Sequence, residues 1–129
     1  YTFNWSTSEH AYGWIMRFSG HDPANPINAS SNLADNNDAP ASPSVTTTVA
    51  DTLILRLGGF DHGDIIPGNP GLSGHAAINL GESGNGAHVV SGASGYVLQA
   101  AAGASGPSSF TLSGSEEFVT VTIGIAPAP

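Results

Sequence analysis

Residues 119–126 read VTVTIGIA, so that apolar and small residues alternate without a break. Successive side chains of a β-strand point to opposite faces of a sheet, and this period of two therefore predicts a half-buried strand. Val119, Val121, Ile123 and Ile125 share one face of that strand. Because no apolar cluster of the chain sustains the spacing of a helix, the pattern indicates an all-β protein.

Three further stretches alternate in the same way, at residues 1–5, 12–18 and 52–60. We expect each of them to be a strand whose larger side chains share one face. Those side chains are Tyr1, Phe3 and Trp5 in the first stretch, Tyr12, Trp14, Met16 and Phe18 in the second, and Leu53, Leu55 and Leu57 in the third, with Ile54 and Arg56 opposite.

The tetrapeptide Gly-x-Ser-Gly recurs at intervals of ten or eleven residues, beginning at Gly71, Gly81, Gly92 and Gly103. Gly and Ser favour turns, and turns at this spacing are typical of a sandwich or barrel. We therefore predict one domain over residues 1–129, built as an antiparallel, jelly-roll-like β-sandwich. A β-solenoid is the alternative, since its coils also repeat.

The region from Ser19 to Ser44 contains four prolines, many Asn and Asp residues, and few large apolar ones. It lacks the alternation of a strand, and it predicts a long loop, either a functional excursion or a crossover between two sheets.

The charge of the chain excludes several partners. Two arginines and no lysine stand against ten carboxylates, for a net charge of -8, so nucleic acids and anionic lipids would be repelled. No apolar run approaches the roughly 20 residues that span a bilayer, and we expect no membrane insertion. The lysine-free surface, rich in Gly, Ser and Thr, favours an extracellular location. Because the chain begins at Tyr1 rather than Met, we expect a mature or trimmed piece of a longer protein.

The turn at residues 60–64, FDHGD, holds the best candidates for a bound ion. Asp61 and Asp64 supply two carboxylates in a bent loop, which suits Ca²⁺, and Asp35 with Asp38 offers a weaker second site. Two carboxylates are fewer than a dedicated calcium loop provides. A solvated turn is therefore the alternative interpretation.

Aromatic residues bear on ligand binding, and the spacing of serines and carboxylates bears on catalysis. Trp5 and Tyr96 are the aromatic residues most free to stack on a sugar ring, because Tyr12 and Trp14 share a face with other apolar residues. A serine hydrolase would need a nucleophile elbow, which the Gly-x-Ser-Gly copies do not form. Glu116 and Glu117 are adjacent and point to opposite faces, so they cannot act together as a glycosidase pair. We expect a protein that is not an enzyme.

Three segments carry a resemblance: residues 20–27 (GHDPANPI), residues 41–53 (ASPSVTTTVADTL) and residues 123–127 (IGIAP). With these, most of the chain resembles a loosely defined family of Gly/Ser/Thr-rich β-sandwich modules in bacterial extracellular and phage or prophage structural proteins. The resemblance implies a role in a surface or an assembly and carries over no active residue. It also implies further strands before the equivalent of residues 1–5, and hence open strand edges that a neighbouring subunit can fill.

These observations predict a structural subunit of an extracellular or virion assembly, a homo-oligomer or filament that associates through strand edges and apolar faces. Lysines that usually guard strand edges are absent, which leaves Arg17 and Arg56 as the basic groups able to pair with a neighbour's carboxylate. The alternative is a carbohydrate-binding or adhesion module assisted by Ca²⁺.

Overall fold

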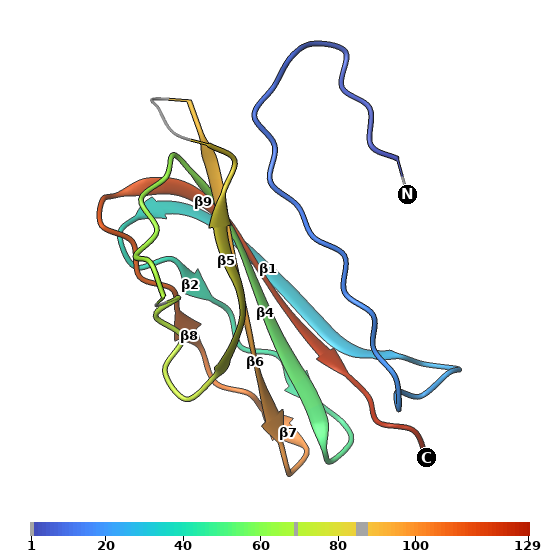
Figure 1. The fold of residues 1–129 in the computed structure, drawn as a ribbon. Coiled ribbons are helices and arrows are strands. Elements are labelled where there is room, and N and C mark those ends of the chain that lie inside the picture. The colour runs from blue at the N-terminus through green and yellow to red at the C-terminus, as the bar shows by residue number, and fades with distance from the viewer. Residues whose placement is uncertain (1, 69, 85–87) are drawn as a thin grey trace.

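The computed structural model describes residues 2–68, 70–84 and 88–129, and shows no helix among them (Figure 1). A five-stranded antiparallel sheet has the order β1-β9-β4-β6-β5, and two short strand pairs, β2 with β8 and β3 with β7, accompany it. This architecture confirms the prediction of an all-β, sandwich-like fold. The strands are β1 (Ile27–Asn37), β2 (Ala41–Ser42), β3 (Thr46–Thr47), β4 (Thr52–Asp61), β5 (Ala76–Glu82), β6 (Val90–Gln99), β7 (Gly103–Ala104), β8 (Ser108–Ser109) and β9 (Glu116–Ile125).

Strand β9 lies inside the sheet, where Val121 pairs with Asn32 of β1 and with Leu57 of β4. The alternation predicted for β4 and β9 is confirmed, and it gives the sheet two different faces. We call the face that carries Leu57 and Val121 the open face. The opposite face, which carries Phe60 and Phe118, is covered by the short strand pairs and their loops, and we call it the inner face.

The apolar core lies on the inner face. Phe60, Ala93 and Phe118 come from the sheet, and the loops that cover it add Leu72, Phe110 and Leu112. The rings of Phe60 and Phe110 meet edge to face, with centroids 5.4 Å apart. All six side chains are at most 5% exposed.

Arg56 of β4 also points into the inner face and is 1% exposed. Its guanidinium donates hydrogen bonds to the carbonyl oxygens of Ser42 (2.8 Å), Pro43 (3.2 Å) and Gly106 (2.6 Å). Its Nε donates to Nε2 of His75 at 2.9 Å. The expectation that Arg56 pairs with a neighbour's carboxylate is therefore wrong, because the side chain is used to join the sheet to the layer that covers it.

Hydroxyl groups of β9 make a second set of connections to that layer. Thr120 donates to the carbonyl of Ala41 and Thr122 to the carbonyl of Pro43, each at 2.6 Å. Thr122 also shares a hydrogen bond of 2.8 Å with the hydroxyl of Ser42. The small polar side of the VTVTIGIA stretch is thus buried, and its hydroxyls are satisfied by the backbone of β2 and the residue after it.

The prediction of a strandless loop over residues 19–44 is wrong, because this region contains β1 and β2. Strand β1 is an edge strand that pairs with β9 from Ile27 to Asn37 through backbone groups. Several of its side chains are exposed, and Asn, Ser and Asp are tolerated there. Its sequence consequently lacks the apolar alternation that marks β4 and β9.

Two other expectations need correction. Residues 12–18 are extended but pair with no strand, and residues 2–5 form none either, while Tyr1 lies outside the described residues. The tetrapeptide that begins at Gly92 is not a turn but lies inside β6, where Ser94 is fully buried.

Candidate functional site

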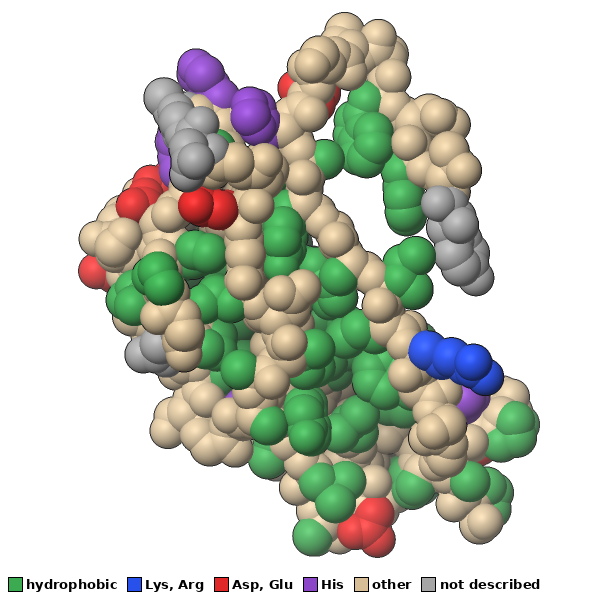
Figure 2. Space-filling model, in the orientation of Figure 1, with side chains coloured by type: hydrophobic (Ala, Val, Ile, Leu, Met, Phe, Trp, Pro, Cys, Tyr) green, Lys and Arg blue, Asp and Glu red, His purple; other side chains and the backbone are tan. Residues whose placement is uncertain are grey.

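The open face is the main apolar surface of the sheet. Its exposed fractions reach 52% at Val119 and 61% at Leu98, although Leu55 in the middle of β4 is buried. Figure 2 shows hydrophobic side chains gathered over this part of the molecule, with a hollow between them and the N-terminal stretch. The apolar side chains of the open face include Ile27, Leu53, Leu55, Leu57, Val90, Tyr96, Leu98, Val119, Val121, Ile123 and Ile125.

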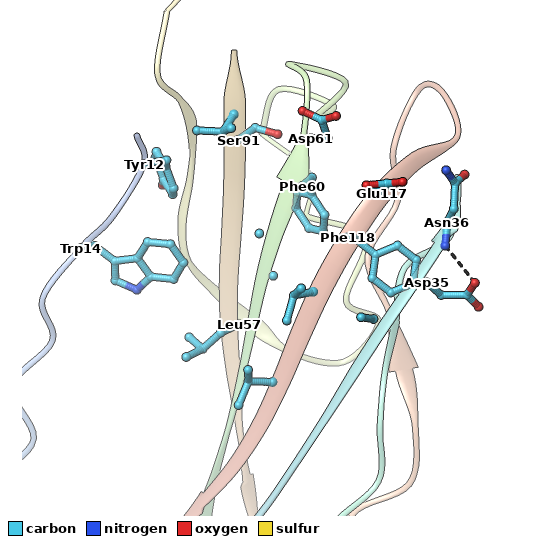
Figure 3. A pocket seen from close by; sticks show the side chains of 16 residues that line it. Tyr12, Trp14, Asp35, Asn36, Leu57, Phe60, Asp61, Ser91, Glu117 and Phe118 are labelled. Carbon is cyan, nitrogen blue, oxygen red and sulfur yellow. Dashed lines mark hydrogen bonds between the residues drawn. The ribbon is translucent and has the colours of Figure 1, made fainter. Parts of the chain in front are cut away.

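A cleft of about 890 Å³ separates Tyr12 and Trp14 from the upper part of this face. Leu57, Val119 and Val121 contribute to its lining, and Figure 3 shows the two aromatic rings on one side with β6 and β4 opposite. Its lining also includes Asp35, Asn36, Asp61 and Glu117, and Ser91, whose hydroxyl donates to the carbonyl of His62.

Two glycines allow Tyr12 to approach the sheet. A Cβ atom at Gly92 would lie 2.5 Å from the Tyr12 ring, and one at Gly81 would lie 3.2 Å from it. Contacts of 2.5 Å do not occur between carbon atoms, so the ring lies where only hydrogen atoms cover the backbone. The hydroxyl of Tyr12 and the indole nitrogen of Trp14 are buried there and have no hydrogen-bond partner among the described residues.

An acidic corner lies where β4 ends, around a second pocket of about 410 Å³. His62, Asp64, Glu82 and Glu116 line this pocket. Gly63 lets Glu82 approach, because a Cβ at Gly63 would collide with the Glu82 carboxylate. His62 has a positive φ of 55°, which turns the chain sharply after Asp61.

Three side chains of this corner offer donor atoms that lie within 4.8 Å of one another: Asp61, His62 and Glu116. Nδ1 of His62 is 2.7 Å from Oε2 of Glu116 and 3.7 Å from Oδ2 of Asp61. We call these three residues the Asp-His-Glu cluster. Asp64 lies beside it and accepts a hydrogen bond of 3.0 Å from the hydroxyl of Ser113.

The hydrogen bond to Glu116 raises the pKa of His62, and the charges of Asp61 and Glu116 add to the effect. Protonated His62 thus stabilises the fold below about pH 6.5, and this contribution is lost as the pH rises through the raised pKa. Hydrogen bonds with Glu116 and Ser113 lower the pKa of Asp64. Its contribution is present above the ordinary pKa of Asp and is lost as the pH falls through the lowered value.

The donor chemistry of the Asp-His-Glu cluster decides which ion it suits. Ca²⁺ takes oxygen ligands, which Asp61 and Glu116 provide. The imidazole of His62 favours zinc or another transition metal. Three side-chain ligands with an open position toward the pocket fit a divalent cation that keeps water as a further ligand.

The predicted site residues are distributed as follows. Asp61 and Asp64 do lie at one corner, but the carboxylate that joins Asp61 in the cluster is Glu116, 55 positions further along the chain. Trp5 is 58% exposed and packs against Phe3, with ring centroids 6.4 Å apart. Tyr96 is 40% exposed and lies on the open face, and neither ring lines the cleft.

Asp35 and Asp38 are both exposed at the end of β1, where the Asp35 carboxylate accepts a hydrogen bond from the backbone N–H of Asn36 at 2.9 Å. The sequence offered no signal for His62 and Glu116 as a pair, because β9 brings Glu116 beside the end of β4 only in three dimensions.

A scan against models of known protein families finds no match, and searches of curated proteins and of solved structures find no similar protein either. The resemblance to the Gly/Ser/Thr-rich modules thus stays an expectation. Among the described residues, no helix is long and apolar enough to cross a membrane.

Proposed function

We propose that this protein is a non-enzymatic structural subunit of an extracellular or virion-surface assembly, and that its copies associate through the open face and the strand edges. The observation that carries the proposal is the row of apolar side chains on the open face, with Ile27, Leu98 and Val119 more than half exposed. Monomeric proteins rarely leave large contiguous apolar patches in water. Covering such a patch with a second copy is the simplest way to remove it from solvent.

Val119→Asp is expected to weaken self-association by at least about tenfold, because it places a charge on the apolar surface of the open face. The fold tolerates the change, since Val119 is 52% exposed. Sedimentation velocity of the wild-type and variant chains over a wide concentration range measures the effect. Val49→Asp is the control, because Val49 is 38% exposed and lies outside the sheet. A wild-type chain that stays monomeric at every concentration overturns the proposal.

A second candidate is a carbohydrate-binding or adhesion module that a divalent cation stabilises at the Asp-His-Glu cluster. The observation that favours it is the convergence of three donor side chains within 4.8 Å. Trp5 and Tyr96 supply exposed aromatic rings on which a sugar can stack. A glycan array with Trp5→Ala and Tyr96→Ala as variants tests this part of the candidate function, and absence of any sugar binding contradicts it.

Added Ca²⁺ or Zn²⁺ is expected to raise the Tm by about 5 °C or more at saturation, because the ion binds the folded chain only. Asp61→Asn and Glu116→Gln should remove the shift, and Glu117→Gln, which changes the neighbouring carboxylate on the other face, should keep it. His62→Gln should reduce the zinc effect more than the calcium effect. Thermal melting with each ion checks these outcomes, and an unchanged Tm with both ions rules out the cation site.

A further inference from the structure

Residues 11–19 have the form of a β-strand without a partner. Tyr12, Trp14, Met16 and Phe18 are half-buried, and every residue between them is exposed. Within the part of the chain that the structure describes, the backbone of residues 2–19 forms no hydrogen bond with another backbone group. Such bonds begin at Gly20, whose carbonyl accepts from the N–H of Ala128 at 2.8 Å. We call residues 11–19 the free strand.

The free strand fits its own sheet incompletely. It lies against the open face through side chains alone, and the cleft remains beneath Tyr12 and Trp14. Both side chains bury a polar atom that finds no partner in the part of the chain that the structure describes, and such atoms destabilise the position they occupy. Gly20, at a φ of 75°, follows directly and gives the backbone a turn that other residues rarely adopt. The free strand can therefore leave the sheet without the loss of a backbone hydrogen bond.

The outer edge of β1 is a complementary surface. Strand β1 is the last strand of the sheet and pairs only with β9 among the described residues, so no backbone group of those residues pairs with its other edge. The backbone N–H of Asn36 has a side-chain partner, the Asp35 carboxylate, at 2.9 Å. Its pairing with β9 is regular over nine residues, from Ala29 to Asn37. The free strand also has nine residues. Neither segment contains a lysine, the residue that often guards an edge against pairing.

We propose that the free strand of one copy pairs with the outer edge of β1 in a second copy, in parallel, so that residues 11–19 lie beside residues 29–37. This inference rests on the proposed function and specifies how the copies join. In this register the large side chains of the free strand stand beside Ser30, Asn32, Ala34 and Asn36 and extend the open face. The unpaired backbone groups of both segments then satisfy one another.

Charge supports the same register. Arg17 is exposed and has no carboxylate within 4.0 Å among the described residues of its own copy. The register places Arg17 opposite Asp35 on the same side of the enlarged sheet. Because Arg56 is buried, Arg17 is the basic side chain that a copy has available for this contact. Each copy supplies a free strand and an edge, so the contact closes into a dimer or continues as a filament.

Exchange of the two charges tests the contact. Arg17→Glu and Asp35→Arg are each expected to weaken association about three- to fivefold, and the double variant should return to within about twofold of the wild type. Glu9→Arg makes the same change of charge as Asp35→Arg, at an exposed residue outside the free strand, and serves as the control for that variant. Association constants come from sedimentation at low salt. Failure of the double variant to recover overturns the assigned register.

Proline substitutions test the backbone pairing. Neighbouring residues of a strand direct their N–H groups to opposite sides, so either Ile15→Pro or Met16→Pro removes a donor that faces β1. That variant should weaken association by at least about tenfold, whereas Met16→Ala, which keeps the N–H group, should not. The monomer should melt unchanged with Ile15→Pro, because Ile15 is 68% exposed and its N–H makes no hydrogen bond to the backbone of another described residue.

The outcomes separate the two proposals. If the wild type associates and Val119→Asp weakens it while both proline variants associate normally, the open face joins the copies and the free strand does not. If a proline variant and the charge exchange behave as expected, the free strand is the connecting element. A monomeric wild type overturns both.

Discussion

Arg56→Met is expected to lower the free energy of unfolding by about 3 kcal/mol or more, because its guanidinium loses hydrogen bonds to three carbonyl oxygens, and a hydrogen bond that involves a charged group contributes about 1.5–3 kcal/mol. Those acceptors belong to Ser42, Pro43 and Gly106, in the layer that covers the inner face. Burial lowers the pKa of Arg56, so the buried charge itself has a cost that the substitution relieves. The loss of three hydrogen bonds from a charged donor outweighs that relief. Urea denaturation followed by circular dichroism measures the change.

Arg17→Met is the matched control for this prediction, since it removes the same charge from an exposed position and should change the stability by less than about 0.5 kcal/mol. The stability of Arg56→Lys should lie between the stabilities of Arg56→Met and Arg17→Met, because one ammonium group cannot reach every acceptor to which the guanidinium donates. Equal stability of the Arg56 and Arg17 variants would show that the hydrogen bonds of Arg56 do not hold the layers together.

Phe110→Ala is expected to lower the free energy of unfolding by about 3–5 kcal/mol, the range observed when a buried phenylalanine ring is removed. Phe110 is 1% exposed and packs edge to face on Phe60, so it joins the covering layer to the sheet through apolar contact. Removal of the ring leaves a cavity between two layers that hydrogen bonds fix in place, and this limits how far the surrounding residues can move to fill the cavity. Urea denaturation measures the change in the free energy of unfolding.

Phe3→Ala controls for the loss of a ring as such, because Phe3 is 71% exposed. Phe110→Leu should recover part of the stability by filling some of the cavity. A Phe110→Ala variant as stable as Phe3→Ala would place the core elsewhere than between Phe60 and Phe110.

The sequence predicts β4 and β9 well because these strands lie inside the sheet, where one face is apolar along its whole length. Strand β1 was not predictable in this way, since an edge strand is held by its backbone pairing with β9, and its polar side chains leave no apolar period. Residues 12–18 show the reverse case. Their alternation is that of a strand, but a strand requires a neighbour, and the described chain supplies none beside them.

The acidic corner could also be predicted only in part from the sequence. Asp61 and Asp64 were recognisable because a bent loop presents both of them within four residues. Glu116 comes from β9, and only the pairing of β4 with β9 brings its carboxylate to His62. Long-range pairing of this kind has no local signal. The burial of Arg56 has no local signal either, since the carbonyl groups that accept its hydrogen bonds belong to two separate segments, at residues 42–43 and at Gly106.

The threonine hydroxyls of β9 have a mechanical consequence. Apolar contacts alone would let the two layers shift over one another by small steps at little cost. The hydrogen bonds from Thr120 to Ala41 and from Thr122 to Pro43 form only when the covering layer has one position relative to the sheet. A shear force along the sheet must break them together with the contacts of Arg56. The two layers should therefore move together, as one rigid body, when a force acts along the sheet.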